Sequence, residues 1–166
     1  MKFNIIVMTC KNNGIGYKGT IPWNEPEDMK YFRKITTHTE DKSKKNAVIM
    51  GRKTFESMCC KPLKNRVNYV LTKDTYNNVD TFINLNDCLK TIEKEDNIEN
   101  TFIIGGYGLY YEAINHDDCQ CIYINVLDEY HDCDVFFPPI DMLKYTKICT
   151  YNLTSNIITY VYKKID

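Results

Sequence analysis

Short apolar runs recur along the chain and are rich in β-branched and aromatic residues, a composition typical of strands. The clearest runs lie at 3–10, 47–51, 67–72, 101–105 and 121–128, with a weaker one at 79–83. Apolar positions spaced three and four residues apart predict helices between these runs, at 26–36, 53–58, 86–95 and 107–115. We expect Asn86 to cap the helix at 86–95.

The order of these elements indicates the fold class. Strands alternate with helices over most of the chain, but two strand-like runs at 145–152 and 157–164 flank only a short turn at 153–156. Helical crossovers connect parallel strands, whereas a short turn connects antiparallel ones. The sequence therefore predicts a single α/β domain over 1–166, with a mostly parallel sheet and an antiparallel C-terminal hairpin.

The composition narrows the classes of function. The 166 residues are 43% apolar and 26% charged, with a net charge of −1, so a disordered tail is excluded and no charge excess favours nucleic acid or a membrane surface. The N-terminus has a strand pattern and not that of a signal peptide. We expect a cytoplasmic protein with no nucleic-acid or membrane partner. Its eight cysteines are expected to be reduced, and their spacing predicts no metal site.

Three acidic residues, Glu25, Glu27 and Asp28, come shortly after the single tryptophan, Trp23. Pro26 suits the first position of a helix, and at about 100° per residue Asp28 shares a face with the apolar residues three, four and seven positions later. Glu25 lies at the helix start, where a negative charge is favourable, and Glu27 faces lysines. A carboxylate on an apolar face needs a partner. Asp28 therefore either faces a ligand or pairs with a buried donor.

The chain has two glycine motifs, one in a predicted loop and the other between a predicted strand and a predicted helix. Residues 14–19 satisfy the G-x-G-x-x-G string, but Pro22 prevents the helix that a dinucleotide fingerprint requires. This segment is either a flexible loop over a ligand or a plain surface loop. Residues 103–110 run from a strand directly into a helix through three glycines, which either admit a phosphate at the helix start or serve only the turn.

Cations come directly after two predicted strands. Arg52 and Lys53 begin a helix after the strand at 47–51, and Lys73 comes after the strand at 67–72. Helix starts favour acidic residues, because the helix dipole is positive there, so these cations suggest a bound anion. Solvated basic residues are the alternative.

Five segments together resemble the dihydrofolate reductase family. They occur in the order and spacing of that family across almost the whole chain, and they are more similar to its eukaryotic and protist members than to its bacterial ones. They are IGYKGTIPWNEPEDMKYFRKIT, VIMGRKTFES, KPLKNRVNYVLT, FIIGGYGLYYEA and DCDVFFPPID. The resemblance implies an eight-stranded sheet with four flanking helices. It also implies hydride transfer from NADPH to C6 of 7,8-dihydrofolate with protonation at N5, giving tetrahydrofolate, and antifolates as further ligands.

The resemblance assigns the substrate site residue by residue. Asp28 corresponds to the acidic residue that holds the pterin and promotes protonation at N5. The backbone carbonyls of Ile6 and Ile104 would flank the pterin, with Asn125 supporting Asp28. The remaining substrate contacts would be Val7, Phe32, Met58 and Leu63 as apolar walls, Arg66 on the glutamate carboxylate, Lys61 at the mouth, and Tyr110 beside the nicotinamide.

The cofactor site is assigned in the same way. A mobile loop would close over the nicotinamide and would consist of Gly14, Ile15, Gly16, Tyr17, Lys18, Gly19 and Thr20, with Met8 nearby. The pyrophosphate would contact Gly105, Gly106, Tyr107, Gly108, Leu109 and Tyr110, with a cis peptide between the paired glycines. The 2′-phosphate and nearby phosphates would contact Gly51, Arg52, Lys53, Thr54, Thr72 and Lys73.

The chain departs from the family pattern at three places. Asn125 stands where a threonine is usual, Phe55 replaces a tryptophan, and Cys59-Cys60 replaces a segment that commonly has proline or glycine. A reductase of the riboflavin pathway would not need Asp28 and Arg66, and a catalytically silent homologue would have lost Asp28, Tyr110 or the glycine pair. The reductase would work either alongside thymidylate synthase or fused to it.

Overall fold

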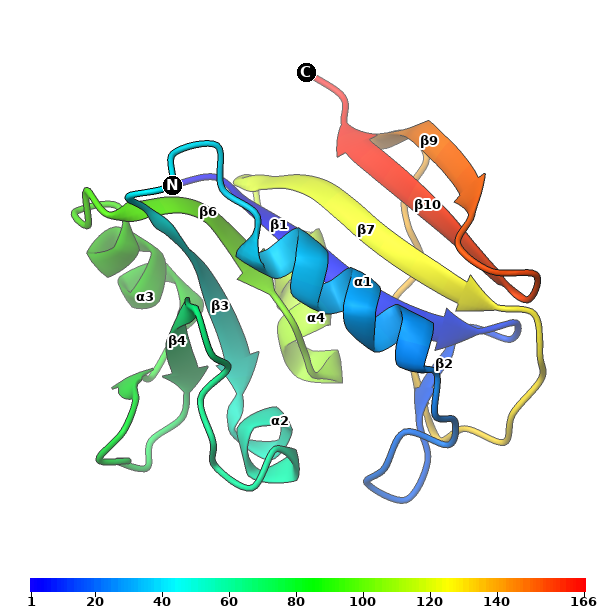
Figure 1. Cartoon of the computed structure of the whole chain (residues 1–166), viewed down its shortest axis with the longest axis horizontal. Helices are drawn as coiled ribbons and strands as arrows, with labels where there is room; N and C mark the ends of the chain where they lie inside the picture. Colours follow the sequence, from blue (N-terminus) through cyan, green and yellow to red (C-terminus); the bar gives the residue numbers. More distant parts are fainter.

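The sheet at the centre of the molecule has eight strands in the order β5-β4-β3-β6-β1-β7-β10-β9 (Figure 1). The structure is a computed structural model that describes all residues, 1–166. The strands are β1 Phe3–Cys10, β3 Lys45–Gly51, β4 Arg66–Leu71, β5 Asp80–Phe82, β6 Ile98–Ile103, β7 Cys119–Leu127, β9 Tyr145–Asn152 and β10 Ile157–Lys164.

The strand directions confirm the predicted mixed sheet. The six strands from β5 to β7 run parallel to one another, and β10 runs antiparallel to both β7 and β9. A second, two-stranded sheet pairs β2 Gly14–Gly16 with β8 Val135–Phe136. Sequence pattern did not predict this small sheet, because strands of three and two residues carry too little periodicity to be recognised.

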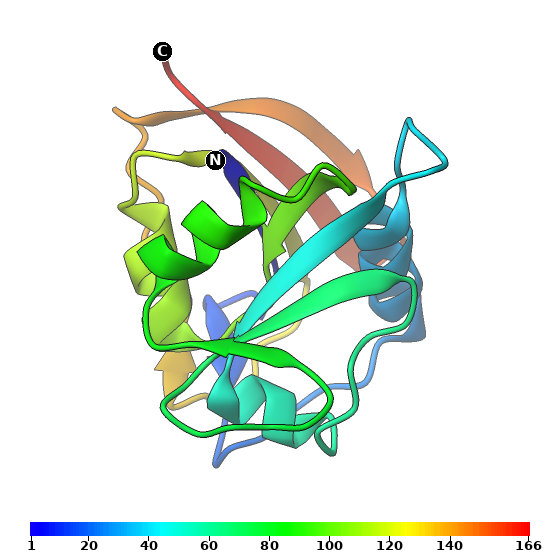
Figure 2. The same ribbon diagram turned by 90° about the vertical axis from the view of Figure 1, so that its left-hand side faces the viewer.

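Four helices flank the sheet, as predicted: α1 Pro26–Thr37, α2 Arg52–Ser57, α3 Leu85–Ile92 and α4 Tyr107–Ile114. The view in Figure 2 shows α3 and α4 on one side of the sheet and α1 on the other. The prediction that Asn86 caps the third helix is wrong. That helix begins one residue earlier, and the side chain of Asn84 accepts a 2.9 Å hydrogen bond from the Asp87 N–H.

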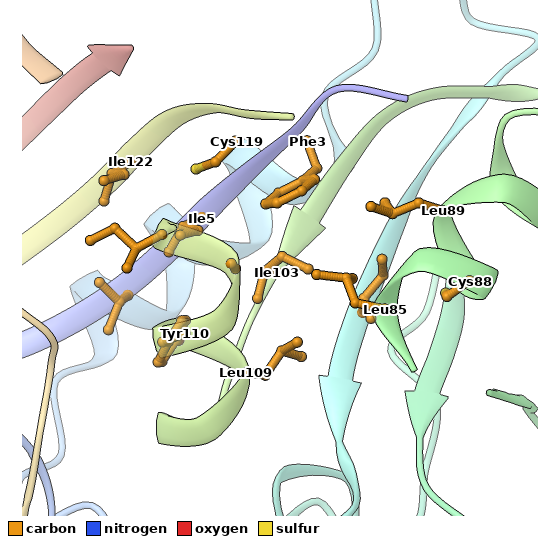
Figure 3. Packing of buried hydrophobic residues seen from close by; sticks show 14 of the residues in the cluster. Phe3, Ile5, Leu85, Cys88, Leu89, Ile103, Leu109, Tyr110, Cys119 and Ile122 are labelled. Atoms are coloured by element: carbon orange, nitrogen blue, oxygen red, sulfur yellow. The ribbon is translucent and has the colours of Figure 1, made fainter. Parts of the chain in front are cut away.

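Alternation along the strands divides the core into two unequal parts. Phe3, Ile5 and Val7 of β1 point toward α3 and α4, where 21 buried residues form one cluster. Figure 3 shows this packing, with Leu109 and Tyr110 of α4 directed at the sheet. On the side of α1 and α2 only seven buried residues form a cluster, and the space near the strand ends is left open.

All eight cysteines are free thiols. No group of three or more histidine, cysteine, aspartate or glutamate side chains is arranged to hold a metal ion. None of the helices has the length and apolar character needed to cross a membrane.

Candidate active site

A cavity of about 610 Å³ opens where the parallel strands β1, β3 and β6 end, between α1 and the beginnings of α2 and α4. The carboxyl ends of parallel strands are where α/β proteins usually bind ligands, because the loops after these strands leave a crevice. The cavity is lined by many residues that the sequence assigned to a site: Ile6, Val7, Met8, Ile15, Gly16, Gly19, Thr20, Asp28, Phe32, Lys53, Thr54, Ile104, Gly105, Gly106, Tyr107 and Tyr110.

Asp28 projects from the first turn of α1 into this cavity. Its Oδ1 accepts a 2.8 Å hydrogen bond from Asn125 Nδ2. Burial raises the pKa of Asp28, the bond from Asn125 lowers that pKa, and the nearby carboxylate of Glu25 raises it. The structure therefore has the buried donor that one interpretation of Asp28 required, and it also places Asp28 on the cavity wall. That Asp28 faces a ligand stays a prediction.

The amide that supports Asp28 has a partner of its own. Asn125 lies on β7 and is 1% exposed. Its Oδ1 accepts a 2.6 Å hydrogen bond from the hydroxyl of Thr159, which is 0% exposed on β10. Asparagine at this position thus donates through its Nδ2 and accepts through its Oδ1. A threonine would have to donate and accept through one hydroxyl group.

A glycine pair forms the floor of the cavity beside α4. The peptide bond between Gly105 and Gly106 is cis, as expected, and the Gly105 carbonyl accepts a 2.8 Å bond from the Gly51 N–H. A Cβ added to Gly105 would lie 3.3 Å from Thr54 Oγ1 and 3.4 Å from the Tyr110 hydroxyl oxygen. A side chain at Gly105 would therefore be crowded by both groups, and its φ of 130° would strain any residue other than glycine.

Tyr110 is buried at the same place, and its hydroxyl donates a 2.9 Å hydrogen bond to the carbonyl of Ile6. Burial raises the pKa of Tyr110 above its usual range, and the charge of Asp28 raises it further. Tyr110 therefore stays neutral at ordinary pH, and its hydrogen bond joins the middle of β1 to α4.

Arg66 lies beside Phe32, which lines the cavity, but Arg66 itself is not part of the cavity wall. Its Nη1 donates to Thr36 Oγ1 at 3.0 Å, its Nε donates to the Lys64 carbonyl at 2.9 Å, and its guanidinium lies 5.8 Å from the centre of the Phe32 ring. No carboxylate pairs with it, and burial, followed by the charge of Arg33, lowers its pKa. A half-buried arginine without an acidic partner is suited to bind an acidic group of a ligand.

Comparison with known proteins agrees with this geometry. The family model described as dihydrofolate reductase matches residues 2–164. The chain belongs to the dihydrofolate reductase family. It is 40% identical to dihydrofolate reductase of Drosophila melanogaster over 147 residues, which is 84% of this chain and 81% of that protein. It is 39% identical to dihydrofolate reductase of Heliothis virescens over 150 residues, which is 85% of this chain and 81% of that protein.

A longer protein is also similar. Bifunctional dihydrofolate reductase-thymidylate synthase 1 of Arabidopsis thaliana is 42% identical over 154 residues, which is 86% of this chain but 30% of that protein. The chain therefore matches the dihydrofolate reductase family in proteins of both lengths.

Other residues assigned by resemblance to the family do not line the cavity: Gly14, Tyr17, Lys18, Gly51, Arg52, Met58, Lys61, Leu63, Arg66, Thr72, Lys73, Gly108, Leu109 and Asn125. Among them, Arg52 is already paired, because its Nη1 donates to both Glu56 oxygens at 2.9 and 3.0 Å. Leu109 is 7% exposed and belongs to the larger core cluster. Lys53 is the one cation that does line the cavity.

Two departures from the family pattern have clear structural outcomes. Phe55 is 0% exposed and packs edge-on against Tyr76, with ring centres 5.1 Å apart. Cys59 and Cys60 both have left-handed backbone, with φ of 55° and 53°, a conformation that favours glycine. Met58 packs against the smaller core cluster and lies outside the cavity wall.

Sequence reasoning missed several residues of the cavity wall: Ile21, Trp23, Asn24, Glu25, Met29, Ser57 and Val135. Glu25 was interpreted as an ordinary helix-start acid, and it is the N-cap residue of α1, but its side chain makes no capping bond. Its position one helical turn before Asp28 was a usable signal. Val135 had none, because it reaches the cavity only through pairing of β8 with β2.

Proposed function

We propose that this chain reduces 7,8-dihydrofolate to 5,6,7,8-tetrahydrofolate with NADPH, and that Asp28 is its acid. The observation that carries the proposal is a half-buried carboxylate on the cavity wall with a buried amide donor behind it. Such a group suits the 2-amino group and N3 of a pterin, which present two donors to one carboxylate. The chain's membership of the dihydrofolate reductase family supports the same substrate.

The residues around Asp28 would bind and orient the pterin. The backbone of Ile6 and Ile104 and the side chains of Val7 and Phe32 line the cavity on either side of Asp28. Because burial raises the pKa of Asp28, the acid form persists to a higher pH than in an ordinary aspartate. Asp28 would supply the proton that N5 gains, by way of water and not by direct contact. Turnover should therefore fall as pH rises past the pKa of Asp28.

The cofactor would bind beside the glycine pair. When bound, NADPH supplies the hydride that C6 accepts. The open backbone at Gly105 and Gly106 would admit the pyrophosphate, with Lys53 and Thr54 beside it. Thr72 and Lys73 would contact the 2′-phosphate, and Arg52 would have to leave Glu56 to join them. Residues 14–20 would close over the nicotinamide and exclude water.

The remaining polar groups would hold the tail of the substrate. Arg66 would grip the α-carboxylate of the glutamate tail, with Lys61 at the mouth, because a guanidinium can make two parallel hydrogen bonds to one carboxylate. Antifolates with the same donor pattern would occupy this part of the cavity. The product would serve one-carbon metabolism and thymidylate synthesis, with the reductase working alongside or fused to thymidylate synthase. A cytoplasmic location stays a prediction.

The decisive experiment measures NADPH oxidation in the presence of dihydrofolate for the wild type and for Asp28→Asn. We expect wild-type turnover and a loss of about 10²-fold in the variant at neutral pH, the scale of a missing acid contribution. Glu27→Gln is the matched control, since Glu27 is an exposed carboxylate on the same helix that pairs with Lys30 at 3.1 Å. An inactive wild type would refute the function, and a fully active Asp28→Asn would refute only the role of Asp28.

Cofactor preference tests the phosphate contacts separately. Replacing Lys53 and Lys73 together by glutamine should lower the preference for NADPH over NADH by roughly 10-fold or more, because charge-assisted hydrogen bonds to the 2′-phosphate are lost. Lys90→Gln on α3, far along the chain from these residues, should leave the preference unchanged. Equal use of NADH and NADPH by the wild type would contradict the assignment.

A further inference from the structure

Thr159 lies within β10, outside the cavity wall, directly opposite Asn125 in the antiparallel pair that β10 forms with β7. The hydroxyl of Thr159 donates to Asn125 Oδ1 at 2.6 Å, and Asn125 Nδ2 donates to Asp28 Oδ1 at 2.8 Å. Three side chains from β10, β7 and α1 thus form one chain of hydrogen bonds that ends at the cavity. Both strand residues are sealed from water, with 0% and 1% of their surfaces exposed.

Only one orientation of the Asn125 amide satisfies every donor and acceptor in this series of hydrogen bonds. The Thr159 hydroxyl hydrogen has Asn125 Oδ1 as its sole acceptor. If the amide of Asn125 turned over, its N–H₂ group would face that hydroxyl and the hydrogen of Thr159 would have no partner. A buried donor without an acceptor is costly. The threonine hydroxyl therefore favours the orientation in which the amide N–H meets Asp28, which is also the end that an ionised carboxylate needs.

We propose that Thr159 is a positioning residue for the reaction, which acts through Asn125 to keep an amide N–H on Asp28 and the carboxylate aimed into the cavity. The proposal rests on the proposed function, in which Asp28 serves the pterin. It assigns a role to a β10 residue that touches neither substrate nor cofactor.

The hydrogen bonds from Thr159 and Asn125 also bear on the protonation of Asp28. A donated N–H favours the charged carboxylate, so the chain from Thr159 opposes the effect of burial and of Glu25 on the pKa of Asp28. The other titratable groups on the cavity wall are Lys53 on α2 and Tyr107 and Tyr110 on α4. Loss of the Thr159 hydroxyl changes none of these groups. It should therefore shift the titration of Asp28 alone, toward higher pH.

The test compares Thr159→Val, which keeps the shape and removes the hydroxyl, with Thr159→Ser, which keeps the hydroxyl. The Asp28 carboxyl carbon is titrated by NMR in the protein without ligands, and kcat/KM is measured against pH. We expect Thr159→Val to favour the protonated form by about twofold to tenfold, the equilibrium change for one neutral hydrogen bond, and to move the pH profile in the same direction. Thr159→Ser should titrate as the wild type.

Thr101→Val is the matched control. Thr101 is also a buried threonine in this sheet, but its hydroxyl has no hydrogen-bond partner, so its removal should leave the Asp28 titration unchanged. An unchanged titration in Thr159→Val, or an equal shift in Thr101→Val, would overturn the proposal.

The wild-type protein provides a test that needs no variant to fold. Because the Asn125 N–H₂ protons donate to Asp28, their resonances should shift with the same midpoint as the Asp28 carboxyl carbon. Independent midpoints would also overturn the proposal. These titrations need no turnover, so an inactive wild type would refute the proposed function and leave the role of Thr159 to be decided separately.

Discussion

The two sides of the sheet use the same strands for different purposes. Under α3 and α4 the alternating side chains of β1, β6 and β7 meet in a dry cluster of 21 buried residues. Under α1 and α2 the cluster has seven, and the same strands end at a cavity of about 610 Å³. The polar residues Asp28, Asn125 and Thr159 belong with the second side. The difference indicates that the filled side supplies stability, which allows the open side to carry a buried carboxylate and unfilled volume.

Replacing one phenylalanine on each side of the sheet should show the difference between the two sides most clearly. Phe3 is 0% exposed in the larger cluster, so Phe3→Ala should lower the free energy of unfolding by about 3–5 kcal/mol. Phe32, half-buried against the smaller cluster and on the cavity wall, is the matched position. Phe32→Ala should cost less than half as much, because the cavity already admits water beside it. Denaturant unfolding measures both, and equal losses would show that the two sides contribute alike.

Replacing Arg66 should affect substrate binding more than the stability of the fold. Arg66→Ala removes a charge-assisted contact to the proposed glutamate tail, so KM for dihydrofolate should rise by about 10- to 100-fold with little change in kcat. Arg33→Ala, an exposed arginine on the neighbouring helix α1, should leave KM within about twofold of the wild type. An unchanged KM in Arg66→Ala would remove the glutamate contact from the proposed function.

In the protein without ligands, the half-buried carboxylate of Asp28 should lower the free energy of unfolding at neutral pH. Its pKa is raised above the unfolded value of 3.8, so the folded state binds more protons than the unfolded state above that pH. Its contribution to stability is therefore present below about pH 3.8 and is lost as pH rises through the folded pKa. Asp28→Asn should raise the free energy of unfolding near pH 7 by an amount of order 1 kcal/mol, while turnover is lost.

Unfolding measured against pH checks this prediction. The difference between Asp28→Asn and the wild type should vanish in strong acid, where Asp28 is protonated in both states. Glu27→Gln, at an exposed position, should change stability little at either pH. A variant less stable than the wild type at neutral pH would contradict the view that the open side sacrifices stability for chemistry.

Much of the fold could be predicted from local patterns. Helix phase placed Asp28 on the inner face of α1, and the run of strands at the end of the chain predicted the β9–β10 hairpin, both of which the structure has. The cap of α3 was misplaced, because Asn84 and Asn86 are equally suited by type; in the structure Asn84 caps the helix and Leu85 is already buried in its first turn. Arg52 resembled a free phosphate ligand, although Glu56 stands four residues later on the same helix, a spacing at which side chains can pair, and the structure shows that pair formed.

The sequence by itself determined where the longer strands and the helices lie to within a few residues, that an acid stands on an apolar face, and which family the glycine and aspartate motifs resemble. These features are local, since periodicity and capping depend on neighbours within a few residues. Only the tertiary structure decided what surrounds that acid. Asn125 is 97 residues from Asp28 and Thr159 is a further 34 residues away. They meet because β7 pairs with β10 and because Asp28 of α1 reaches the side chain of Asn125 on β7. No local pattern encodes that meeting, because it depends on which strands become neighbours in the sheet.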